Sequence, residues 1–153
     1  MLVYEAPAIE ADPARLKQMF DTNVFGLFDV VQAFAPLLIA AVADSGNAAP
    51  TVANVASVLA RLPMPFSSGY NATKAAVSAY SDTLRLELSP LGIRVVTLLM
   101  SEVSTLLMSS DNIRFGEKSL YADVEHKVKG GRTSMRRRRS HPVHSPSRSS
   151  IGC

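Results

Sequence analysis

Two short apolar runs set the strongest limit on how this chain can fold. TVANVASV, residues 51–58, and RVVTLLM, residues 94–100, are bounded by turn residues and are typical of buried strands. One amphipathic helical pattern precedes them, from about residue 13 to residue 43, and a second lies between them, from about residue 67 to residue 88. A helix between two strands of one sheet predicts a right-handed parallel crossover. The predicted fold class is therefore α/β.

Local signals place the helix ends. Asp12 and Pro13 are typical of a helix start, because aspartate is a good N-cap acceptor and the first helical position needs no N–H donor. Pro90 and Gly92 end the second helical pattern. The strand at 94–100 is almost entirely apolar after Arg94, so we expect both faces of the sheet to be covered.

Length and composition limit the chain to one domain or part of one. The 153 residues are 47% hydrophobic, enough for a single core. The sole cysteine, Cys153, excludes an internal disulfide and a cysteine-pair metal site, and we expect no metal. The N-terminal stretch does not resemble a signal peptide. Asp29 and Gln32 interrupt the longest apolar stretch, so we also expect no transmembrane segment.

The positive charge is confined to one end of the chain. Residues 1–125 carry 8 basic and 13 acidic side chains, whereas residues 126–153 carry 8 basic and none that is acidic. This basic tail has few large apolar groups to offset the entropy of ordering it, so we expect residues 126–153 to be disordered. The predicted organisation is a domain at 1–125 followed by that tail.

Polar residues gather near the end of the first predicted strand. Ser57 lies there, and the carboxyl end of a parallel strand is where open α/β sheets bind ligands. Tyr70 and Lys74 follow at the start of the next helix, four positions apart and hence on one helix face. Such a pair often arises by chance, so its neighbours must decide whether it is functional.

Those neighbours resemble the catalytic tetrad of the short-chain dehydrogenase/reductase family. Asn23 in TNVFG, Ser57 in NVAS, and Tyr70 with Lys74 in YNATK stand in the family's order and near its spacing.

The resemblance extends well beyond these four residues. It continues through AFAPLLIAA at 33–41 and SAYSDTLRLELSPLGIRVVTL at 78–98, and it covers about residues 3–125. The stretches AFAPLL, LPMPFSSGYNATKAAV and MSEVST are most similar to the fungal 1-acyl-dihydroxyacetone-phosphate reductase branch. The implied fold is a partial Rossmann-like, doubly wound parallel sheet.

The resemblance implies a role for each residue. Tyr70 would exchange a proton with the substrate oxygen, and Ser57 would donate a hydrogen bond to that oxygen. Lys74 would lower the pKa of the phenol, as a nearby cation does, and would hold the nicotinamide ribose. Asn23 would hold a water that links Lys74 to solvent. Each residue also has a plain structural alternative: a turn cap for Ser57, a satisfied buried amide for Asn23, a half-buried core residue for Tyr70 and a surface lysine for Lys74.

Part of the family's cofactor site has no counterpart in the sequence. None of the eight glycines falls in the TGxxxGxG pattern that receives the pyrophosphate of NAD(P), and the chain begins just past the position of the family's NNAG motif. We therefore expect the N-terminal dinucleotide-binding half to be lacking. In the family, the loop after the second of these strands contacts the nicotinamide. The resemblance therefore implies cofactor contacts at Val103 and Thr105, which fit the family pattern, but Ser101 stands where glycine is usual.

The implied function is an NADP(H)-dependent carbonyl reductase acting on an apolar or lipid-like ketone, inactive as this chain alone. The resemblance also implies a homodimer through the two long helices and an intracellular, cytoplasmic location, with peripheral association to the endoplasmic reticulum or lipid droplets. The alternative is a non-enzymatic interaction protein whose helices pair and whose basic tail binds nucleic acid or an anionic membrane. A solvated tail without a nucleic-acid partner is the simpler interpretation.

Overall fold

The computed structural model describes residues 1–44, 46, 48–101, 113 and 115–139. In chain order the elements are α1 (Pro13–Phe20), a π-helical turn η1 (Asp21–Phe25), α2 (Gly26–Asp44), β1 (Thr51–Ser57), a 3-10 turn η2 (Val58–Ala60), α3 (Ser68–Leu88), a 3-10 turn η3 (Ser89–Leu91), β2 (Arg94–Met100) and α4 (Ala122–Arg139). The expected α/β class and all four expected elements are confirmed.

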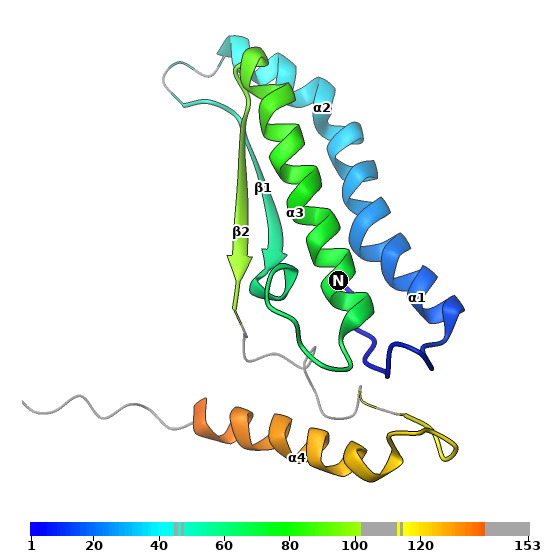
Figure 1. The fold of residues 1–153 in the computed structure, drawn as a ribbon. Helices are drawn as coiled ribbons and strands as arrows, with labels where there is room; N and C mark the ends of the chain where they lie inside the picture. Colours follow the sequence, from blue (N-terminus) through cyan, green and yellow to red (C-terminus); the bar gives the residue numbers. More distant parts are fainter. Residues whose placement is uncertain (45, 47, 102–112, 114, 140–153) are drawn as a thin grey trace, which may run out of the picture.

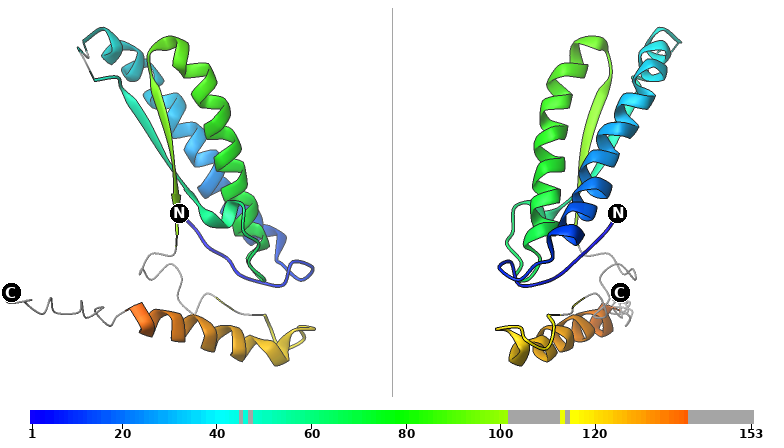
Figure 2. Two further views of the ribbon diagram at one scale, coloured as in Figure 1. Left: turned by 60° about the vertical axis from the view of Figure 1, so that its left-hand side comes forward. Right: turned by 90° about the vertical axis from the view of Figure 1, so that its right-hand side faces the viewer.

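The two strands form a parallel pair. They are in register from Thr51 beside Arg94 to Ser57 beside Met100. α3 connects them and runs back along the sheet, with α2 at its side, so both helices lie on the same side of the strands (Figures 1 and 2). Val31 of α2, Leu84 of α3 and Val95 of β2 form one buried cluster between these layers.

The helix ends have the predicted causes. The Asp12 carboxylate accepts a hydrogen bond from the Ala14 N–H at 2.8 Å, and Pro13 occupies the first helical position. α3 ends at Leu88, and Gly92 follows with φ of +78°, a backbone conformation that favours glycine. Gly69 has a different function: a Cβ there would collide with the side chains of Leu16 and Met19, so glycine lets α1 approach α3 closely.

One expectation about packing is wrong. In the described part of the sheet only one face is covered by helices, and Val55, Leu98 and Met100 remain 41–49% exposed. An almost entirely apolar strand can thus leave one face of the sheet without a helix over it. Residues 126–139 of the basic tail lie in α4, and the expected division into a domain at 1–125 and a disordered tail stays a prediction.

Local interactions account for α4. Asp123 and Glu125 lie in its first turn, where negative charge interacts favourably with the helix dipole and stabilises the helix. Glu125 also pairs with Lys129, one turn later, at 2.5 Å. α4 lies beyond the carboxyl ends of both strands (Figure 1), and Glu125 accepts a hydrogen bond from the Phe115 N–H at 3.1 Å. Residues 140–153 are outside the described part of the chain.

One continuous helix, Pro13–Ala43, is long and apolar enough to cross a membrane by length and composition. This is weak evidence for a membrane span, since core helices of soluble proteins meet the same criterion.

A buried polar contact joins β1 to α3. The Asn54 side chain donates to the Ser81 hydroxyl at 2.9 Å, and Ser81 donates to the Val77 carbonyl at 2.7 Å. Asn54 is 2% exposed and Ser81 is fully buried. Because no water can replace a lost partner there, both groups depend on this contact.

We expect Ser81→Ala to lower the free energy of unfolding by about 1–3 kcal/mol, because the buried Asn54 amide loses its acceptor. The measurement is a urea denaturation followed by circular dichroism. Ser78→Ala is the matched control on the same helix: its hydroxyl is buried and has no partner among the described residues, so its loss should be neutral or stabilising. Equal destabilisation by both variants would contradict this interpretation.

Candidate active site

Ser57 ends β1 at the carboxyl edge of the sheet. Its backbone is extended, and its hydroxyl oxygen accepts a hydrogen bond from the Leu59 N–H at 3.2 Å. The structural alternative for this residue, a turn cap, is therefore present. A hydroxyl that accepts from the backbone still has its own O–H to donate. Capping and a catalytic role are compatible at Ser57.

Tyr70 and Lys74 lie on the buried face of α3. They are 6% and 4% exposed, so neither is a surface residue. The Ser57 side chain lies close enough to the Tyr70 hydroxyl to favour the phenolate form by hydrogen bonding. The Lys74 ammonium donates to the Val55 carbonyl at 2.8 Å and lies 5.9 Å from the centroid of the Tyr70 ring. The structure thus brings together the three residues predicted to lie at this edge.

Burial, not charge, dominates the protonation of this pair. Desolvation raises the pKa of Tyr70 above its ordinary value, and the hydrogen bond from Ser57 lowers it only in part. Burial also lowers the pKa of Lys74. The expectation that Lys74 brings the phenol pKa towards neutrality is therefore not met in this structure. At neutral pH the phenol keeps its proton and can donate it.

Asn23 lies in the π-helical turn between α1 and α2. Its side chain makes paired hydrogen bonds with Leu2, donating to the carbonyl and accepting from the N–H, each at 2.7 Å. It also donates to the Thr73 hydroxyl at 3.4 Å. The amide is thus held by backbone, as the structural alternative has it, and π-helical turns are frequent at functional sites. Its role towards a water stays a prediction.

Thr73 is a site residue that the sequence did not single out. It is fully buried, and its hydroxyl donates to the Tyr70 carbonyl at 2.8 Å. It therefore joins Asn23 to the helical turn that carries Tyr70. In the sequence, the only feature of Thr73 that points to the site is its position directly before Lys74. Val103 and Thr105, the other predicted cofactor contacts, lie outside the described residues.

The side chains at this edge fit the nicotinamide-ribose end of a dinucleotide. An ammonium has three donors, and the Val55 carbonyl takes one of those of Lys74. The Tyr70 hydroxyl donates to the Met1 sulfur at 3.7 Å, a weak acceptor that a ligand oxygen can displace. Lys74 and Tyr70 can thus present hydrogen-bond donors to ribose and carbonyl oxygens.

Ser57→Ala should raise the pKa of Tyr70 further, because it removes the one hydrogen bond that lowers it. The measurement is a spectrophotometric titration of phenolate, with a Tyr70→Phe titration subtracted to remove Tyr4, Tyr80 and Tyr121. Ser78→Ala is again the control, and its curve should match that of the unaltered chain. A Tyr70 titration that does not change in Ser57→Ala would show that the hydroxyl contact has no effect on the phenol.

Comparison with known proteins agrees with this geometry. Residues 3–114 match the family described as short chain dehydrogenase. The chain is 38% identical over 110 residues to Short-chain dehydrogenase virD of Hypocrea virens, covering 72% of this chain and 36% of that protein. It is also 38% identical over 104 residues to the NADPH-dependent 1-acyldihydroxyacetone phosphate reductase of Schizosaccharomyces pombe, covering 68% and 33%.

Solved structures show the same fold. A 3-ketoacyl-(acyl-carrier-protein) reductase from Brucella melitensis, complexed with NADH, superposes with a TM-score of 0.64 at 29% identity, covering 69% of this chain and 43% of that one. A gluconate 5-dehydrogenase from Burkholderia cenocepacia, in complex with NADP and tartrate, gives 0.62 at 27% identity, covering 69% and 39%. The chain thus spans well under half of each of these proteins. The matched family and the shared fold place this chain in the short-chain dehydrogenase/reductase family of oxidoreductases.

Proposed function

We propose that this chain carries the acid–base half of an NAD(P)-dependent carbonyl reductase. The observation that carries the proposal is the buried contact of Tyr70 with Ser57, with the Lys74 ammonium 5.9 Å from the phenol ring, at the carboxyl end of a parallel strand. A lone buried lysine is costly, and burial together with a specific partner is typical of functional sites.

The proposed reaction is the reduction of a ketone to an alcohol. A bound reduced nicotinamide would supply the hydride to the carbonyl carbon. Tyr70 donates its proton to the carbonyl oxygen, and its raised pKa means that the phenol carries that proton at neutral pH before the step. Ser57 donates a hydrogen bond to the same oxygen while negative charge develops there. Lys74 holds the ribose hydroxyls, and its ammonium, 5.9 Å from the centroid of the phenol ring, stabilises the phenolate that remains after the proton is donated.

For the substrate, we propose an apolar or lipid-like ketone such as 1-acyl-dihydroxyacetone phosphate, with NADPH as the cofactor. The support is the 38% identity to the Schizosaccharomyces pombe reductase, whose described activity uses both. The pyrophosphate needs backbone N–H donors of a glycine-rich turn, and the glycines of residues 1–153 do not have that spacing. The reaction therefore requires that turn from outside these residues.

The test uses the chain alone and the same chain preceded by the N-terminal part of Short-chain dehydrogenase virD. We expect no measurable NADPH binding by residues 1–153 alone, and saturable binding with carbonyl-dependent NADPH oxidation by the fusion. In the fusion, Tyr70→Phe should lower kcat by roughly 10²–10⁴-fold, because it removes the proton donor.

The matched control is Tyr80→Phe, a tyrosine ten positions further along α3 that stacks on Phe28 and does not touch the site. It should leave kcat near that of the parent fusion. NADPH binding by the chain alone would contradict the assignment of the pyrophosphate contacts. Full activity of Tyr70→Phe would contradict the proposed role of Tyr70.

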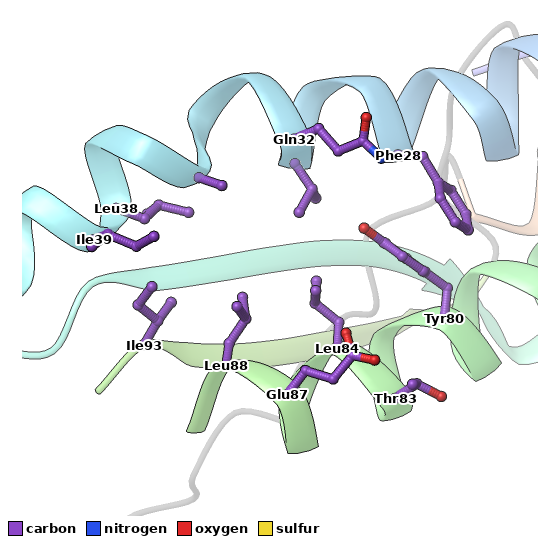
Figure 3. Close-up of a pocket in the computed structure, with 12 residues that line it drawn as sticks. Phe28, Gln32, Leu38, Ile39, Tyr80, Thr83, Leu84, Glu87, Leu88 and Ile93 are labelled. Carbon is purple, nitrogen blue, oxygen red and sulfur yellow. The ribbon is translucent and has the colours of Figure 1, made fainter. Parts of the chain in front are cut away.

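We also propose that this chain forms a symmetric dimer through α2 and α3. An apolar groove of about 490 Å³ runs between these helices, and side chains from both point into it (Figure 3). Phe34, Leu37 and Ile39 leave more than half of their surface exposed along α2. Symmetric pairing of identical apolar patches is the common way to cover such a surface. The groove is lined by Phe28, Val31, Gln32, Ala35, Leu38, Ile39, Tyr80, Thr83, Leu84, Glu87, Leu88 and Ile93.

Light scattering at tens of micromolar should therefore give the mass of a dimer. Ile39→Glu, which places a charge in the groove at a residue already 54% exposed, should give monomer. Leu62→Glu is the control, since Leu62 is 60% exposed and lies outside the groove. Folded monomer from the unaltered chain would contradict the dimer, as would an unchanged dimer in Ile39→Glu.

A further inference from the structure

Glu5 is a buried carboxylate that the proposed reaction does not use. It is 2% exposed, and its Oε1 accepts a hydrogen bond from the Ser67 hydroxyl at 2.8 Å. Ser67 is itself only 1% exposed. A hydrogen bond to a buried charged group is among the stronger single contacts in a protein. This contact joins residues 62 positions apart in the sequence.

The contact lies directly at the start of α3. Ser67 is the N-cap of α3, yet its side chain does not cap its own helix, because the hydroxyl donates to Glu5 instead. The Glu5 carboxylate thus brings negative charge to the N-terminus of this helix, where the helix dipole stabilises it. Next to it, the Ala6 N–H donates to the Phe66 carbonyl at 2.8 Å. Side chain and backbone therefore fix the same turn.

That turn is not one the chain adopts without support. Phe66 has φ of +64°, in the left-handed region that only a few residues other than glycine occupy. Its ring packs against Phe115, with centroids 4.7 Å apart, and against Tyr121 at 5.6 Å. A strained turn persists only where its surroundings hold it.

The same N-terminal segment also packs on the candidate acid. Val3, Tyr4 and Ala6, which flank Glu5, form one buried cluster with Met19 and Tyr70. Tyr70 is three residues after Ser67, in the first turn of α3. A change in where α3 begins would therefore move the phenol directly.

We propose that Glu5 is a positioning residue: through Ser67 it fixes the first turn of α3 and so holds Tyr70 against Ser57. The inference rests on the proposed role of Tyr70 for its functional meaning, but the contact itself can be tested without cofactor or substrate. The contact by which Glu5 acts on Tyr70 is its hydrogen bond with Ser67 at the start of α3.

The experiment compares Glu5→Ala, Glu5→Gln and Ser67→Ala in the 153-residue chain. The first readout is hydrogen exchange of the backbone amides of residues 71–74, the first in α3 with an acceptor in the helix, relative to those near Leu84. In Glu5→Ala, exchange of residues 71–74 should speed up by at least about tenfold, while the end of the helix changes little. Glu5→Gln keeps an oxygen that accepts from Ser67, so its exchange should stay close to that of the unaltered chain.

The second readout is the titration of Tyr70, isolated by subtracting a Tyr70→Phe curve. Burial raises the pKa of this phenol, so opening of the first turn to water in Glu5→Ala should move it down towards its ordinary value. Ser67→Ala should have the same direction of effect. The variant that combines Glu5→Ala with Ser67→Ala should shift the Tyr70 pKa no further than Glu5→Ala alone, because both changes remove the same hydrogen bond.

Glu10→Ala is the matched control. Its carboxylate also holds the N-terminal segment in place, because it accepts hydrogen bonds from the Ser119 hydroxyl at 2.6 Å and the Leu120 N–H at 2.9 Å. Both of these partners lie outside α3. It should leave the Tyr70 titration unchanged. If Glu5→Ala does not fold, Ser67→Ala and Glu5→Gln still decide the question.

The proposal is overturned if hydrogen exchange rises equally along all of α3 in Glu5→Ala. It is also overturned if the Tyr70 pKa in both Glu5→Ala and Ser67→Ala equals that of the unaltered chain. Either result would make Glu5 a general stabilising residue. Such a failure concerns Glu5 alone, because neither readout uses cofactor or substrate. Failure of the proposed reaction would instead appear as an active Tyr70→Phe fusion.

Discussion

The parallel pairing of β1 with β2 determines where everything else can lie. A chain that leaves the carboxyl end of β1 must return to the opposite end before it can enter β2, and α3 provides that return. The first turn of α3 therefore lies beside the last residue of β1. Ser57 and Tyr70 meet for this reason, although thirteen residues separate them.

The next helical turn completes the site by the same geometry. Lys74 is one turn further along α3, so its long side chain reaches back to β1 two residues before the strand ends, at the Val55 carbonyl. The four-residue spacing of Tyr70 and Lys74 thus has two consequences. It places both groups on the face that meets the strand, and it draws the ammonium out of water. Burial then raises the pKa of one group and lowers that of the other.

Sequence patterns predicted the strands and helices, which depend on local periodicity, but they did not predict features that depend on tertiary packing. The strands and α3 were placed within one residue of their observed ends, because turn residues such as Gly92 mark them. The π-helical turn around Asn23 leaves no such mark, since one extra residue in a turn hardly changes a helical pattern. The exposed face of the sheet was missed because apolar residues indicate what could be covered, not what is covered.

The candidate site was predictable only in part for a related reason. Tyr70 and Lys74 carry a spacing signal, and Ser57 carries a strand-end signal. Thr73 and Glu5 carry neither, because their importance comes from partners far away in the sequence. The pKa of Tyr70 was predicted with the wrong sign, since a sequence shows which charges are near in the chain and does not show how far water is excluded.

Buried polar contacts repeatedly join distant segments in this small structure. Asn54 ties β1 to Ser81, Asn23 ties the π-helical turn to Leu2, and Glu5 ties the N-terminal segment to Ser67. Each pairing is satisfied only in one arrangement, so together these contacts favour one register of helices on strands over its alternatives. Residues of the candidate site take part in the same set of contacts. Their substitution therefore changes both chemistry and packing, and only a readout at the phenol itself can separate the two.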